Sequence, residues 1–168
     1  KNPNIIMSDA DLDIAIQGVI DGMRYTRQGQ ACTAGSRVYI QEKIYDKVIN
    51  GVVEKLSKLK MGNALDEGSD IGAIISEEQL KRTLHYMDIA KQTSSAKVVH
   101  GGNQPTGGDY KNGFFYEPTL MSGVPVDSPV CQEEIFGPVA CAIPFKTFEE
   151  VMQSANDTPF GLSAVLWT

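Results

Sequence analysis

Segments with a helical period alternate along this chain with short segments of strand character, and this alternation is the strongest constraint on its fold. Apolar residues recur at helical spacing over 12–25, 44–59, 76–90 and 147–156. Around them lie alternating or β-branched segments at 4–7, 37–41, 96–100, 114–121, 139–145 and 164–168. This order predicts an α/β layered domain with a largely parallel sheet flanked by helices.

Several residues can mark the ends of the predicted helices. A hydroxyl side chain is followed three residues later by a carboxyl or amide side chain at Ser8, Ser76 and Thr147, which is typical of a helix N-terminus. Gly62 is typical of a C-terminus and ends the second helix near residue 62. The glycine-rich segment 101–108 lacks the spacing of a phosphate-binding loop, so we expect a surface loop there.

Composition narrows the class of protein. A chain of 168 residues with 42% apolar and 21% charged residues suits one globular domain. The net charge is −6 and the basic residues are scattered, which disfavours nucleic acid as a partner. With no apolar run of membrane-spanning length and no signal segment, we expect neither a membrane anchor nor export, and hence a cytoplasmic protein. Three cysteines without Cys-x-x-Cys spacing predict neither a disulfide framework nor a metal site.

Cys32 lies among small residues, in the segment Gly-Gln-Ala-Cys-Thr-Ala-Gly-Ser-Arg at 29–37. The helical period stops before this segment and a strand follows it, so we expect Cys32 on a helix-to-strand loop. Small neighbours leave a thiolate open to a substrate, and the peptide N–H of Cys32 could hold an oxyanion. From these residues alone, a small buried cysteine is the alternative interpretation.

Glu134 and Phe136 form a second candidate pair, in the segment Gln-Glu-Glu-Ile-Phe-Gly-Pro-Val at 132–139. In an extended segment, residues two apart project to the same face and could meet one ligand. The carboxylate could accept hydrogen bonds from ribose hydroxyls, while the ring could pack against a nicotinamide. An exposed acid beside a core aromatic is the alternative.

These two segments and Asn-Gly-Phe-Phe-Tyr-Glu-Pro-Thr at 112–119 occur in an order that resembles the aldehyde dehydrogenase superfamily, and the resemblance covers essentially the whole chain. It implies the catalytic-domain fold of that family, NAD or NADP as cofactor, a small aldehyde as substrate and a homodimeric or homotetrameric parent protein. It assigns Cys32 as nucleophile, Glu134 as the ligand of the nicotinamide ribose and Phe136 as the ring that orients the cofactor.

The resemblance also points to further residues. Gln79 matches a position that contacts the ribose in some relatives, although a glutamine three residues after a serine cap has a structural explanation too. Thr26 and Arg27 match the segment that lines the aldehyde tunnel, and they depart from the residue types that relatives often carry there. With Ala31 and Thr33 beside the cysteine, they complete the expected substrate pocket.

The implied reaction oxidises an aldehyde to a carboxylic acid. The thiolate adds to the carbonyl, hydride leaves the thiohemiacetal for the nicotinamide, and water hydrolyses the resulting thioester. A CoA-acylating semialdehyde dehydrogenase and a non-catalytic structural relative are alternatives. A thiol hydrolase is disfavoured, because no histidine is identified as a partner for Cys32.

The resemblance further implies that residues 1–168 are the nucleophile-bearing domain of a longer chain. In the family, the lysine before Asn-Pro-Asn closes a Glu-Leu-Gly-Gly-Lys motif whose glutamate is the general base, so that base would precede Lys1. The dinucleotide-binding domain is also outside this sequence. We therefore expect the segment alone to be inactive.

Overall fold

The secondary structure consists of six strands and five α-helices in the computed structural model, which describes residues 1–168 apart from the side chain of Asp109. The strands are β1 (Pro3–Ile6), β2 (Arg37–Gln41), β3 (Lys97–His100), β4 (Thr119–Ser122), β5 (Val139–Phe145) and β6 (Val165–Trp167). The helices are α1 (Leu12–Met23), α2 (Tyr45–Leu56), α3 (Glu77–Gln92), α4 (Pro129–Gln132) and α5 (Phe148–Asn156). Three 3-10 turns, η1 (Tyr25–Arg27), η2 (Glu42–Ile44) and η3 (Gly108–Asn112), complete the set.

The six strands form one sheet in the order β3-β4-β5-β2-β1-β6. All neighbouring strands are parallel except β3, which runs antiparallel to β4 at one edge. The central strands β2 and β5 are buried over most of their length, as expected for a parallel sheet covered on both faces. The predicted α/β domain with a largely parallel sheet is confirmed.

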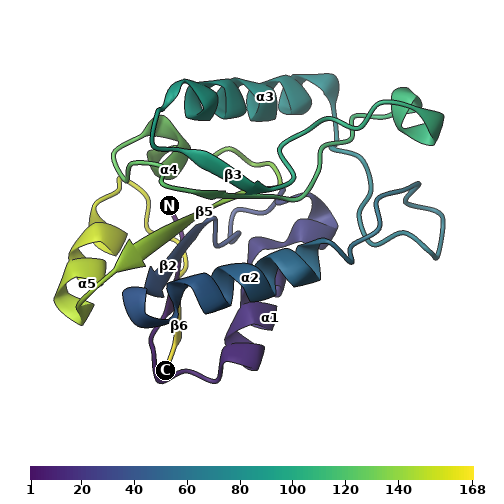
Figure 1. Ribbon diagram of the computed structural model, residues 1–168. Helices are drawn as coiled ribbons and strands as arrows, with labels where there is room; N and C mark the ends of the chain where they lie inside the picture. Colours follow the sequence, from purple (N-terminus) through teal and green to yellow (C-terminus); the bar gives the residue numbers. More distant parts are fainter.

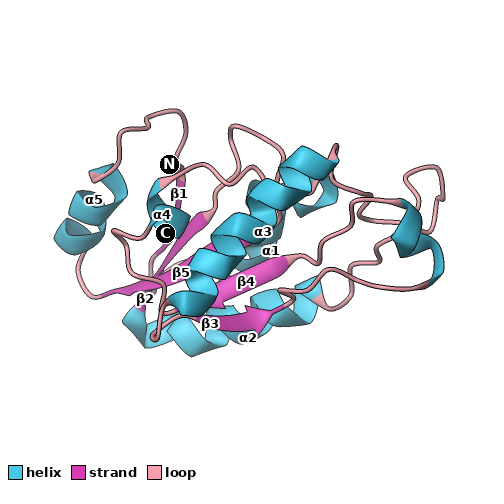
Figure 2. Ribbon diagram, turned by 90° about the horizontal axis from the view of Figure 1, so that it is seen from above, coloured by secondary structure: helices cyan, strands magenta, loops and turns pink.

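Helices cover the two faces of the sheet. Helix α3 lies on one face, and α1 and α2 lie on the other (Figure 1). The view from above shows α3 running across the strands (Figure 2). The short helices α4 and α5 share the α3 side, since their buried residues belong to the same hydrophobic cluster.

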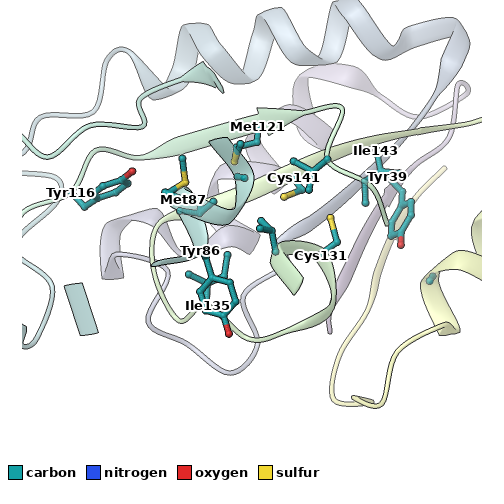
Figure 3. Packing of buried hydrophobic residues seen from close by; sticks show 14 of the residues in the cluster. Tyr39, Tyr86, Met87, Tyr116, Met121, Cys131, Ile135, Cys141 and Ile143 are labelled. Atoms are coloured by element: carbon teal, nitrogen blue, oxygen red, sulfur yellow. The ribbon is translucent and has the colours of Figure 1, made fainter. Parts of the chain in front are cut away.

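Two hydrophobic cores follow from this layering, one on each side of the sheet. The core beneath α3 contains Met87 from the helix, Met121 from β4 and two buried cysteines, Cys131 and Cys141 (Figure 3). The other core packs apolar residues of α1 and α2 against β1 and β2. Strands and helices therefore meet through alternate faces of the same β-strands.

Two predicted helix boundaries were wrong. The cap of α1 is Asp11, whose Oδ1 accepts hydrogen bonds from the backbone N–H groups of Asp13 and Ile14 at 3.0 and 3.2 Å. The backbone N–H of Ser8 donates instead to the Gln41 side chain, because a turn separates it from the helix. Helix α2 ends at Leu56, earlier than predicted, and irregular chain follows.

The predicted strand at 114–121 begins only at Thr119. Residues before it bond to loops outside the sheet, with the Phe114 carbonyl accepting from the backbone N–H of Ile74 and the Glu117 N–H donating to the Asn103 carbonyl. Helix α4 was not predicted, because four residues are too few to show a period. The predicted caps Ser76 and Thr147 are confirmed.

No helix in the described chain combines the length and the apolar character needed to cross a membrane. Among the described residues, no group of three or more His, Cys, Asp or Glu side chains is arranged to hold a metal ion.

Candidate active site

A pocket of about 270 Å³ opens at one end of the sheet. Its walls come from residues 1–2, from the 29–36 and 134–139 loops, and from residues 160–162, together with Met23 of α1. These four segments immediately precede β1, β2, β5 and β6. The pocket therefore lies at the amino ends of four parallel strands, whereas open α/β sheets usually bind ligands at the carboxyl ends.

Cys32 lies on the loop between α1 and β2, as predicted, and lines this pocket with an exposed side chain. The loop is held by Asn2, whose Nδ2 donates to the carbonyls of Cys32 at 2.6 Å and Ala34 at 3.1 Å. Within the described part of the chain, the peptide N–H of Cys32 donates to no other group. Both the thiol and this donor are therefore available to a molecule in the pocket.

The nucleophile loop touches the opposite wall at Gly29. Its φ is +65°, and a Cβ at this position would lie 2.2 Å from the carbonyl oxygen of Gly137. Only glycine combines this backbone conformation with such a close approach of two main chains. The contact fixes the Cys32 loop against the loop that carries Glu134 and Phe136.

Glu134 and Phe136 both line the pocket with Cys32, but the geometric reason given for this was wrong. Phe136 has φ +59°, in the left-handed region, so the segment is bent and not extended. The turn brings the two side chains to one pocket by a route that alternation along a strand does not describe.

Gln79 contacts the same segment from behind. Its Nε2 donates to the carbonyls of Ile135 at 2.9 Å and Phe136 at 2.8 Å. The Ser76 hydroxyl accepts from the Gln79 backbone N–H at 3.2 Å, which is one half of the predicted capping arrangement. The Gln79 side chain serves the loop and does not return to the cap, and the residue is outside the pocket lining.

The expected substrate residues separate into two groups. Ala31 lines the pocket next to Cys32. Thr26 and Arg27 lie in η1 with exposed side chains, and Thr33 is exposed on the nucleophile loop; these three are outside the pocket lining.

Several pocket residues were missed in the sequence. Lys1 and Asn2 contribute from the start of β1, and Phe160 and Leu162 contribute half-exposed apolar side chains before β6. The only sequence signal for the first pair is the polar start of an otherwise apolar strand. The exposed apolar pair after Pro159 is a signal only once the turn is placed beside the pocket.

Lys1 is a buried cation at the floor of this region. Its ammonium donates to the Val130 carbonyl. Burial lowers the pKa of this amine from its ordinary value, and the Arg37 guanidinium acts in the same direction, against the opposing influence of the two buried thiols and Glu134.

Arg37, the first residue of β2, ties the start of β1 to the end of α5. Its guanidinium donates to the carbonyls of Lys1 and of Ala155, the latter at 2.7 Å, and to the Tyr39 hydroxyl at 2.9 Å. A cation is favoured near the carbonyl end of a helix. This fully buried group fixes the strand that follows the Cys32 loop.

The fold and the pocket together define a thiol-bearing site in an α/β domain, and comparison with known proteins gives its family. The sequence model described as "Aldehyde dehydrogenase family" matches residues 1–168. The chain is 37% identical over 168 residues to a betaine aldehyde dehydrogenase of Bacillus subtilis, covering 100% of this chain and 34% of that protein. It is 40% identical over 169 residues to a D-glyceraldehyde dehydrogenase (NADP(+)) of Picrophilus torridus, with the same coverage of 100% and 34%.

Solved structures show the same relationship. The crystal structure of betaine aldehyde dehydrogenase from Staphylococcus aureus in complex with NAD+ matches 99% of this chain and 33% of its own, with a TM-score of 0.94 and 37% identity. An NAD+ complex of an aldehyde dehydrogenase from Bacillus cereus matches with a TM-score of 0.93 and 38% identity, over 100% of this chain and 33% of its own. The chain belongs to the aldehyde dehydrogenase family. It spans about one third of the length of these relatives.

Proposed function

We propose that this chain is the nucleophile-bearing part of an enzyme that oxidises an aldehyde to a carboxylic acid with NAD or NADP. The observation that carries the proposal is that Cys32, Glu134 and Phe136, which lie about a hundred residues apart in the sequence, line one pocket. The names of the relatives supply the reaction class, and both NAD+ and NADP(+) occur among them.

The pocket fits the nicotinamide end of such a cofactor. The Glu134 carboxylate can accept hydrogen bonds from two ribose hydroxyls, and the Phe136 ring offers an aromatic face beside them. When bound, a nicotinamide ring accepts a hydride. The role of this chain is to hold that ring next to the carbon atom attached to Cys32.

Cys32 divides the oxidation into two steps. Its thiolate attacks the aldehyde carbon, a C–S bond forms, and the carbonyl electrons move to oxygen, where the Cys32 N–H can stabilise the oxyanion. Loss of hydride from that carbon restores the C=O bond and leaves a thioester on Cys32. Water then attacks the thioester carbon and the C–S bond breaks, which yields the acid and regenerates the thiol.

Two further parts of the proposal follow from the resemblance. The general base would be supplied by the sequence preceding Lys1, so residues 1–168 alone would not turn over. The whole enzyme would be a cytoplasmic homodimer or homotetramer.

The direct test is NADH or NADPH formation by the full-length protein from a panel of aldehydes. Cys32→Ala should lower the rate by a factor of roughly a thousand or more, because the covalent step has no other nucleophile. Cys141→Ala is the matched control, since it removes a thiol that is buried in β5 outside the pocket and should leave most of the activity. Turnover by Cys32→Ala at the parent rate would remove the mechanism.

Alkylation gives an independent check of accessibility. Iodoacetamide should modify Cys32 in the folded protein and reach Cys131 and Cys141 only after unfolding, since the latter two are buried. Peptide mapping by mass spectrometry reads the result. Protection of Cys32 in the folded protein would contradict an open nucleophile.

A further inference from the structure

Helix α3 contacts the backbone of the 133–137 segment through a row of side chains. Gln79, Arg82, Thr83 and Tyr86 recur at three- and four-residue spacing and therefore share one face of the helix. We call this row the α3 clamp. Because the segment carries Glu134 and Phe136, the clamp lies directly behind the candidate cofactor wall.

The clamp binds three successive carbonyl groups. The Arg82 Nε donates to the Glu134 carbonyl at 3.2 Å. The Gln79 Nε2 donates to the two carbonyls that follow, those of Ile135 and Phe136, at 2.9 and 2.8 Å. Main-chain groups of this segment are thus held by side chains where a strand or helix would hold them by its own backbone.

The two ends of the segment are fixed as well. The Tyr86 hydroxyl donates to the Glu133 carboxylate at 2.6 Å. At the other end, a Cβ on Gly137 would lie 2.3 Å from the Thr83 Oγ1, so the backbone rests directly on the helix. Ile135 is buried in the same cluster as Tyr86 and anchors the centre (Figure 3).

Phe136 is the residue that needs this support. Its φ of +59° is a conformation that costs a residue with a side chain about 1 kcal/mol or more. Such a conformation persists only where neighbouring groups determine it. The groups bound directly to the carbonyls on either side of this φ angle are the two N–H bonds of Gln79.

We propose that Gln79 is a positioning residue, which holds Phe136 in its left-handed conformation so that Phe136 and Glu134 face the cofactor. The inference rests on the proposed function, since the segment matters for catalysis only if it contacts the dinucleotide. It replaces direct ribose contact as the role of Gln79. A primary amide has two N–H donors, and both are used by the loop, which leaves only Oε1 as an acceptor.

This difference can be tested by two substitutions in the full-length enzyme. Gln79→Glu keeps the size and an acceptor but removes both donors, and Gln79→Met keeps the length without charge, donor or strong acceptor. If Gln79 positions the loop, both variants should weaken NADH binding by roughly tenfold, since two hydrogen bonds are lost in each. NADH fluorescence titration measures this without turnover, with NADPH in its place if the enzyme uses that dinucleotide.

Glu78→Gln is the matched control, because Glu78 is the exposed neighbour on the same helix turn. It should bind NADH like the parent. In both Gln79 variants, the KM for the aldehyde should change by less than about twofold, because Cys32 is held by other contacts. A role in folding alone would lower the melting temperature and leave NADH affinity unchanged well below that temperature, which would overturn the inference.

The remaining outcomes also decide. Unchanged or tighter binding in Gln79→Glu overturns positioning, as does a loss confined to Gln79→Glu, which would indicate charge repulsion. Glu134→Ala separates this inference from the proposed function. Weaker binding in Glu134→Ala with normal binding in both Gln79 variants would refute only the positioning role, whereas normal binding in all three would refute the cofactor site itself.

Discussion

Tyr116 carries a hydroxyl group that is buried without a hydrogen-bond partner among the described residues. The side chain is 2% exposed and lies in the core beneath α3 (Figure 3). Burial raises its pKa to about 12, because the phenolate would lose its hydration, and the carboxylates of Glu117 and Asp88 act in the same direction. An unpaired buried hydroxyl lowers stability at neutral pH.

We predict that Tyr116→Phe raises the free energy of unfolding by about 1 kcal/mol at neutral pH, because it removes the unpaired hydroxyl. The folded-state pKa lies above the unfolded value of 10.0, so the tyrosine's contribution is complete below pH 10 and is lost as the pH rises towards 12. The variant should therefore lose less stability over that alkaline range. Urea titrations at neutral and alkaline pH measure both effects.

Tyr110→Phe is the control with the opposite sign. The Tyr110 hydroxyl donates to the Met61 carbonyl at 3.0 Å, so its removal should lower stability by about 1 kcal/mol. If both substitutions destabilise the protein equally, Tyr116 has a partner in solution and the interpretation is wrong.

The sequence could predict the residue types of the candidate site but not all of their geometry. Cys32 among small residues requires an open loop, and the structure has one. The left-handed Phe136 could not be predicted, because its cause lies in the side chain of Gln79, more than fifty residues away. Thr26 and Arg27 were expected in the pocket, yet their 3-10 turn directs them to the surface.

At the scale of elements, α3 depends on its first residue. The Ser76 side chain accepts the Gln79 N–H, and the carboxylates of Glu77 and Glu78 in the first turn are favourable near the positive helix end. Because the α3 clamp begins at Gln79, this cap sets the position of the first clamp residue.

We predict that Ser76→Ala lowers the free energy of unfolding by about 1 kcal/mol, which is typical of a lost N-cap. Ser94→Ala, in the exposed turn after α3, should change it by less than about 0.5 kcal/mol. Chemical denaturation monitored by circular dichroism gives both values. Equal effects of the two substitutions would mean that the cap contributes nothing.

Element type was easier to predict than element ends. The four long helices show an apolar stripe that burial in the cores requires, so their existence follows from local sequence. Their ends depend on competing partners. Ser8 has the sequence of a cap, but Gln41 from another strand takes its backbone N–H, and the helix starts at Asp11 instead.

Over the whole molecule, the first and last strands are joined by one tryptophan. Trp167 donates from Nε1 to the Asn4 Oδ1 at 2.7 Å, and its ring covers Gly18 in α1. A Cβ at Gly18 would lie 2.1 Å from the ring atom Cζ2. The glycine therefore provides the space into which β6 docks.

We predict that Gly18→Ala lowers the free energy of unfolding by about 1 to 2 kcal/mol, because the ring must leave its site. Without that contact, alanine would stabilise the helix by roughly 0.5 to 1 kcal/mol, so the sign of the change is diagnostic. Trp167 is the sole tryptophan in the 168 residues, and its emission should shift to longer wavelength. The exposed neighbour Gln17→Ala should alter neither stability nor emission.

The pocket at the amino ends of the strands leaves the other end of the sheet without a role in the proposed chemistry. The connections after β1, β2 and β5 meet there, where Gln41 links Ser8 to Lys146. Lineages of this protein can therefore vary those connections, and an engineer can lengthen or tag them, while the reacting centre is spared. Divergence and design have the same free margin, on the side of the domain that faces away from the thiol.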